Sequence, residues 1–168
     1  MIATVTGPAG WAYLLLLTLH ILCAIVGFGG VMLNGIWGST LSKTQGEAAG
    51  VLARTLEKVS KVAEVFIIAV AVLGVIVLLL SDGAHSFSSP WVWISIILFV
   101  AALGLSLGVL APTSGKLVAL AEAGNQPSPE REALEKKVAA VSGMLHLSLV
   151  VILLLMVFGP STDWLVAG

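Results

Sequence analysis

Four long apolar segments dominate this chain and restrict it to one class of fold. They cover residues 11–37, 62–80, 91–111 and 139–158, and no Lys, Arg, Asp or Glu occurs in the first 42 residues. A helix needs about 20 residues to cross a hydrocarbon core of about 30 Å. A backbone exposed to lipid must satisfy its hydrogen bonds internally, so these segments are predicted to be helices. The sequence therefore predicts an all-α, polytopic membrane protein, with one domain over 1–168 that forms a four-helix up-down bundle.

Turn-forming residues and prolines set the expected ends of these helices. Residues 81–83 follow the second segment and Pro90 opens the third, while Pro112 is expected to close the third. Two helices are predicted to project from the membrane. One is the charged, helically patterned stretch 47–61, and the other begins at Ser128, where an N-cap residue precedes Pro129 and an acidic first turn.

Basic residues predict the orientation of the bundle. All eight lie in the first and third connections, and the second connection and both ends of the chain have none. The positive-inside rule places these two connections in the cytoplasm and both termini outside. They are Lys43, Arg54, Lys58, Lys61, Lys116, Arg131, Lys136 and Lys137.

Several function classes are excluded by what the chain lacks. Its net charge of −1 gives no electrostatic basis for binding nucleic acid. No phosphate-binding loop, nucleophile elbow, HExxH or CxxCH motif occurs, which argues against a hydrolase or an NTP-driven enzyme. No acidic or basic residue lies near the middle of a span, so a proton relay is also unsupported. Membrane redox chemistry is the one enzyme class that we retain.

Two histidines within the spans are the candidate functional residues. His20 and His146 lie in stretches without other ionisable side chains, and a titratable residue in hydrocarbon is costly enough to suggest function. At 1.5 Å per residue, His20 lies about 14 Å below an outer boundary near residue 11, and His146 about 18 Å below one near residue 158. If the first and fourth helices are neighbours, the two imidazoles are predicted to be axial ligands of one haem b. Gly27 and Gly143, on the same faces, would leave room for the ring.

Other interpretations of these residues stay open. Copper would recruit Cys23 beside His20, with soft methionine sulfurs as further ligands (Met32, Met144 or Met156). Alternatively, each imidazole is neutral and bonded to a neighbouring hydroxyl or carbonyl. The small residues, including the run from Gly104 to Gly108, would then serve close helix packing in a cofactor-free accessory subunit. The third histidine, His85, is expected to be solvated in an external loop.

The segment LHIL at 19–22, followed by GFGG at 27–30, resembles the opening of a known group. It is similar to uncharacterised bacterial four-helix membrane proteins related to copper-resistance protein D, as is LAP at 110–112. Weaker similarity extends to four-helix protoporphyrinogen oxidase, which has a basic, aromatic-rich segment where this chain has NGIWG at 34–38. Cytochrome b561-type proteins are also similar, but they use four histidines for two haems and this chain has three histidines. The resemblance implies haem or copper chemistry in the bacterial cytoplasmic membrane.

The sequence thus favours a membrane b-type haem protein in electron transfer or in haem or quinone redox chemistry. Its partners would be the lipid bilayer and either a quinone or a larger redox complex, and self-association is a further expectation. The alternatives are a cofactor-free accessory subunit of a larger membrane complex and a copper-handling membrane protein.

Overall fold

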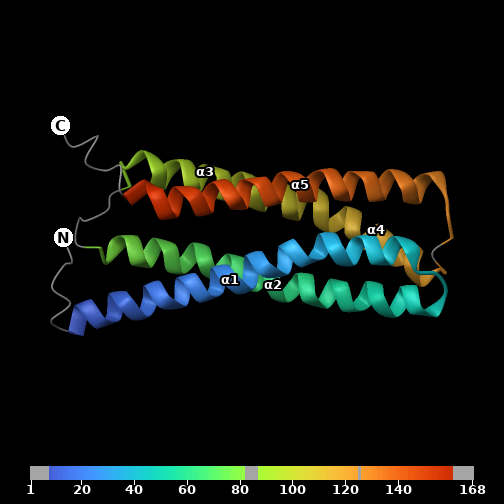
Figure 1. Cartoon of the computed structure of the whole chain (residues 1–168), viewed down its shortest axis with the longest axis horizontal. Helices are drawn as coiled ribbons and strands as arrows, with labels where there is room; N and C mark the ends of the chain where they lie inside the picture. The colour runs from blue at the N-terminus through green and yellow to red at the C-terminus, as the bar shows by residue number, and fades with distance from the viewer. Residues whose placement is uncertain (1–7, 82–86, 125, 161–168) are drawn as a thin grey trace.

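The computed structural model describes residues 8–81, 87–124 and 126–160, and regular structure within these ranges is entirely helical (Figure 1). The predicted all-α class is therefore confirmed. Four long helical stretches follow one another along the chain. They are α1 (Pro8–Lys43); α2 (Glu47–Leu79); the continuous series α3 (Pro90–Leu105), η1 (Ser106–Leu110) and α4 (Ala111–Glu122); and α5 (Pro129–Phe158).

All four stretches are long and apolar enough to cross a membrane. They contain 30 to 36 residues, which corresponds to about 45–54 Å of helix at 1.5 Å per residue. The hydrocarbon core measures only about 30 Å, so each helix extends past it. The predicted helical continuity of residues 47–61 with the second apolar segment is confirmed, because α2 runs without a break from Glu47 to Leu79.

The start of α5 follows the sequence prediction in atomic detail. The Ser128 hydroxyl accepts a hydrogen bond of 3.1 Å from the backbone N–H of Arg131, and Pro129 occupies the first helical turn. This cap satisfies one of the backbone donors that a helix leaves unpaired at its N-terminus. The sequence signal is sufficient here because every group involved lies within four residues.

The expected end of the third helix is wrong. Helical structure continues through Pro112 to Glu122, because the ladder widens into the π-helical turn η1 immediately before the proline. The N–H of Ala111 bonds to the carbonyl of Ser106, five residues back, and the Thr113 hydroxyl bonds to the Val109 carbonyl at 2.6 Å. Proline lacks an N–H and clashes with the carbonyl four residues earlier. The wider turn lets the helix pass this position.

The helices pack as two pairs, α1 with α2 and α3 with α5 (Figure 1). The continuous third stretch links them, since α4 contacts both α2 and α5. A more limited contact joins α1 to α5, and within the described ranges no Cα atom of α3 lies within 8 Å of one in α1 or α2. The beginning of α1 and the end of α5 lie at the same end of the bundle (Figure 1).

The other end of the bundle holds its most completely buried core, which we call the collar (Leu41, Ala49, Ala53, Val118 and Ala121). Its three alanines are 0–1% exposed. Such small side chains allow the backbones of α2 and α4 to approach closely. An exposed ion pair of 3.1 Å between Arg54 and Glu122 lies beside this core.

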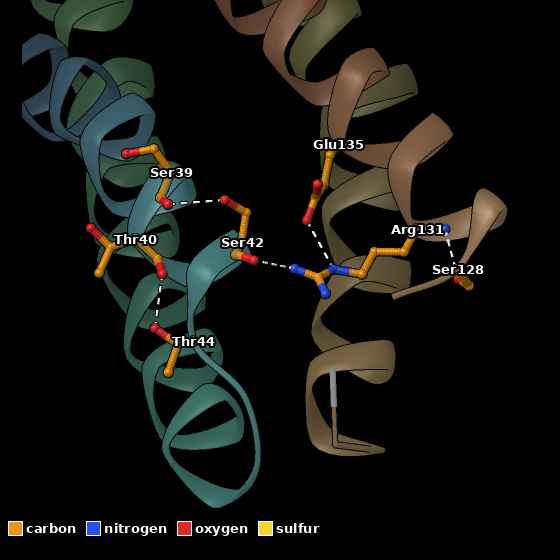
Figure 2. Close-up of polar contacts among 7 residues, drawn as sticks. All are labelled: Ser39, Thr40, Ser42, Thr44, Ser128, Arg131 and Glu135. Carbon is orange, nitrogen blue, oxygen red and sulfur yellow. Dashed lines mark hydrogen bonds and ion pairs between the residues drawn. The ribbon is translucent and has the colours of Figure 1, made fainter. Parts of the chain in front are cut away.

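Two further contacts close the collar. The N–H of Gly46, whose φ of 67° suits glycine, donates a 3.3 Å bond to the carbonyl of Gly124 and so joins the two connecting loops. Arg131 is only 6% exposed; its Nε bonds to Glu135 at 2.9 Å and its Nη2 donates to the Ser42 carbonyl (Figure 2). A buried guanidinium on α5 therefore holds the last turn of α1.

Candidate functional site: two intramembrane histidines

His20 connects α1 to α2. Its Nδ1 lies 2.9 Å from the carbonyl oxygen of Val70, and the neutral imidazole donates its proton there because the carbonyl can only accept. Gly74 lies against the ring, since a Cβ at this glycine would be 3.0 Å from His20 Cε1. A donating Nδ1 leaves Nε2 as the free basic nitrogen of the half-buried ring.

His146 connects α5 to α1 and uses its other nitrogen. Its Nε2 lies 3.0 Å from the carbonyl oxygen of Val31, so Nδ1 is the basic nitrogen of this imidazole. The ring is half-buried. The two histidines therefore have opposite tautomers and contact different helices. Each bonds to a backbone carbonyl of another helix, which is the bonding expected of a neutral imidazole in an apolar span.

The structure does not bring the two imidazoles together. His20 is level with Val70 on α2, whereas His146 is level with Val31, eleven residues further along α1. Eleven residues correspond to about 16 Å along the helix. The expectation of similar depth is wrong, because it assumed that α1 and α5 start and end at the same level and that the His20 face of α1 packs on α5. That face packs on α2.

The two glycines expected to make room for a ring also lie apart. Gly27 is buried against α2, where an added Cβ would meet Ile67 Cγ1 at 3.0 Å and the Ile67 backbone nitrogen at 3.2 Å. Gly143 is exposed, and nothing lies within 4 Å of the position of its Cβ. Gly27 thus serves close packing of α1 on α2, and Gly143 lies on the outer surface of α5.

A metal centre finds few ligands here. Cys23 is a free, half-buried thiol one helical turn from His20. In the part of the chain that the structure describes, no three His, Cys, Asp or Glu side chains gather into a group that could hold a metal ion. Met32, Met144 and Met156 are all exposed. His85 lies outside the described residues.

The positions of the two histidine side chains decide how a haem iron could be ligated here. In a bis-histidine haem the two imidazoles lie on opposite sides of one iron, which requires them to be at the same depth, and His20 and His146 do not meet this requirement. One-histidine ligation through His20 Nε2 agrees better with the donor chemistry. A ligating histidine usually donates its other ring N–H to a carbonyl or carboxylate, which fixes the tautomer, and Val70 accepts the Nδ1 proton in this way.

A second candidate surface lies on the third helical stretch. Gly104 and Gly108 form a GxxxG pair, and nothing lies within 4 Å of either Cβ position. Three more small residues extend this surface, which we call the small-residue strip (Ala101, Gly104, Gly108, Ala111 and Gly115), and all five are exposed. The sequence revealed the small residues, but their exposure follows from the pairing of α3 with α5.

Sequence reasoning missed the collar contacts. Arg131 was assigned only to the basic cytoplasmic connection, yet its side chain is among the few buried polar groups of the described chain. Its position, one turn after the N-cap and four residues before Glu135, was a local signal for the ion pair. No local signal indicates the bond to Ser42, 89 residues away.

Comparison with known proteins places the chain in a family. No curated protein and no solved structure matches it. A family model described as "Predicted integral membrane protein (DUF2269)" matches residues 14–160, a range that contains both intramembrane histidines and all four helical stretches for most of their length. The chain therefore belongs to this family of integral membrane proteins.

Proposed function

We propose that the protein is an accessory subunit of the membrane, which associates laterally with another transmembrane helix through the small-residue strip. The observation that supports this proposal is the open GxxxG pair Gly104 and Gly108. Lipid tails are as apolar as leucine, so helices associate in a bilayer through close packing, and small residues allow their backbones to approach. The residues inside the bundle that serve such packing, Gly27 and Gly30, are already covered by α2.

The test uses one large side chain at matched positions. Gly104→Leu and Gly108→Leu add bulk to the strip, whereas Gly143→Leu adds the same bulk to an equally open glycine on α5. The tagged protein is purified from its native membranes in mild detergent, and co-purifying subunits are quantified by mass spectrometry. Mass photometry of the purified protein separates self-association from a partner subunit.

We expect the strip variants to lose at least tenfold of the associated subunit and Gly143→Leu to retain it. Equal recovery from all three variants would contradict the proposal. A monomeric wild-type protein that recovers no other membrane subunit would contradict it as well.

A second candidate function is that of a membrane b-type haem protein, and the orientation of His20 favours it. His20 Nε2 would be the axial ligand, while Val70 fixes the ring through Nδ1. The haem would supply a one-electron redox centre within the membrane, with a quinone or a larger redox complex as its partner. His146 takes no part in this coordination, because its depth differs by about 16 Å.

Absorption spectra test this second candidate. Protein from haem-replete cells is recorded oxidised and then dithionite-reduced, followed by a pyridine haemochrome assay. We expect a Soret band that His20→Ala abolishes and His146→Ala retains. A flat wild-type spectrum would reject haem binding, and metal analysis of the same samples tests copper, which would be stoichiometric and lost in Cys23→Ser.

We also propose that the protein lies in the bacterial cytoplasmic membrane with the collar on the cytoplasmic side. All eight basic residues belong to the helical stretches near the α1–α2 and α4–α5 connections, and the positive-inside rule then sets the orientation. Labelling of single cysteines in intact cells tests this topology. A cysteine at exposed Lys137 should resist an impermeant reagent until the cells are opened.

A further inference from the structure

The two helix pairs are joined in the half of the bundle nearer the collar. Arg131 bonds to Ser42 across the pairs, and Arg54 bonds to Glu122. Farther from the collar lies the bond from His146 to Val31, which is eleven residues before Ser42 on α1. At the opposite end the described part of α3 contacts neither α1 nor α2, although α3 itself packs on α5.

Each pair is tied internally along the half that lacks these cross-contacts. His20 bonds to Val70 within the α1/α2 pair, and Gly27 packs on Ile67. In the other pair, Trp91 of α3 packs directly against Gly159 just after α5. The pairs are therefore cohesive units, and their connection is concentrated toward one end.

The third stretch contains a weak point where it passes from one pair to the other. Its α3 part packs with α5 alone of the other long helices, its α4 part packs with α2 as well as with α5, and η1 with Pro112 lies between these two parts. The proline contributes no N–H, and the π-helical turn replaces the regular ladder with a bond from Ala111 to Ser106. Exposed Gly108 adds no side-chain packing at this point. Sharp bends in helices occur at prolines and π-turns, and π-turns often accompany functional sites.

From these observations we infer that the bundle is hinged. The α1/α2 and α3/α5 pairs move apart at the end opposite the collar, and the hinge lies at residues 106–112. The bond from His146 to Val31 limits the opening. The collar stays closed because its alanines and Arg131 are fully packed. Opening would move the two intact pairs apart without breaking a helix.

Spin-label distance measurements in nanodiscs test the hinge on the whole chain. Labels are placed in a Cys23→Ser background on exposed residues of α2 and α5: Leu79→Cys with Val157→Cys at the opening end, and Val51→Cys with Ala133→Cys at the collar. The variants are His146→Ala, which removes the tie between the pairs, and His20→Ala, a matched control that removes a tie within one pair. Pro112→Ala tests the hinge itself by restoring a backbone donor.

We expect the distance distribution at the opening end to be at least twice as wide as that at the collar. His146→Ala should widen it further, His20→Ala should leave it unchanged, and Pro112→Ala should narrow it. Equal widths at the two ends of the wild-type protein would overturn the inference. The inference would also be overturned if His146→Ala and His20→Ala changed the distance distribution at the opening end alike, or if Pro112→Ala left that distribution unchanged.

Discussion

Close approach of α1 and α2 at Gly30 makes a quantitative prediction about packing. A Cβ added at Gly30 would lie 2.7 Å from Ala63 Cβ, whereas carbon atoms in contact prefer about 3.5–4.0 Å. The two helices would have to separate by about 1 Å at this point, and overpacking of this kind costs about 1–3 kcal/mol. Gly30→Ala also gains about 0.5–1 kcal/mol from helix propensity. Its net effect on the free energy of unfolding is therefore smaller than the clash itself.

Gly29→Ala is the control that separates the steric clash from the gain in helix propensity. It is the preceding residue on the same helix, and nothing lies within 4 Å of its Cβ position. Gly29→Ala should receive the propensity gain without the clash, so the two variants should differ by about 1–3 kcal/mol. Ala63→Gly in the Gly30→Ala background should remove most of the penalty, because the next atom, Ala63 Cα, is 3.8 Å away.

Reversible unfolding in mixed micelles of increasing SDS content, followed by tryptophan fluorescence or by steric trapping, gives these free energies. The double-mutant cycle Gly30→Ala with Ala63→Gly reports the pairwise term directly. Equal stability of Gly29→Ala and Gly30→Ala would refute the packing argument, and so would a penalty that Ala63→Gly leaves intact.

Three further predictions use the same unfolding assay. Gly159→Ala should destabilise the protein by about 1–3 kcal/mol, because its Cβ would overlap the Trp91 side chain. Trp91→Ala in that background should relieve part of the loss. A Gly159→Ala variant with an unchanged free energy of unfolding would contradict the described packing. Arg131→Ala should cost about 1–3 kcal/mol by removing a buried donor to Ser42 and Glu135. Arg54→Ala removes an exposed ion pair with Glu122 and should cost less than about 1 kcal/mol. A larger stability loss from Arg54→Ala than from Arg131→Ala would show that the collar is held differently. Ser128→Ala should cost about 1 kcal/mol through loss of the N-cap of α5, and Ser128→Asp should restore stability if capping is the cause.

Helix boundaries that depend only on residues close in the sequence were predicted correctly in two cases. The start of α5 at Ser128 and the continuous helix from Glu47 depend on contacts within a few residues, and both were predicted correctly. Pro112 misled the prediction because the usual effect of proline on a helix is cancelled by the π-turn before it, for which the sequence has no distinct signal.

Of the candidate site, sequence analysis identified the residues but not their relations. His20 and His146 are both half-buried and both bonded within the apolar spans. Their separation depends on which helix each face packs against and on the relative shift of α1 and α5, and neither quantity is encoded in the spacing along one helix. The same reason explains the strip from Ala101 to Gly115, whose exposure is set by α3 packing on α5 through another face.

The sequence by itself determined that this chain crosses a membrane as four helices, because apolar length and internal backbone hydrogen bonding leave no other solution in lipid. It also determined where charge gathers and which polar residues lie within the spans. The tertiary structure decided that α1 pairs with α2 and α3 with α5, that two histidines lie about 16 Å apart along α1, and that a buried arginine closes the collar. In a bilayer every helix face is apolar, so hydropathy cannot distinguish a face that meets lipid from one that meets protein. Only the close fit of side chains such as Gly30 with Ala63 makes that choice.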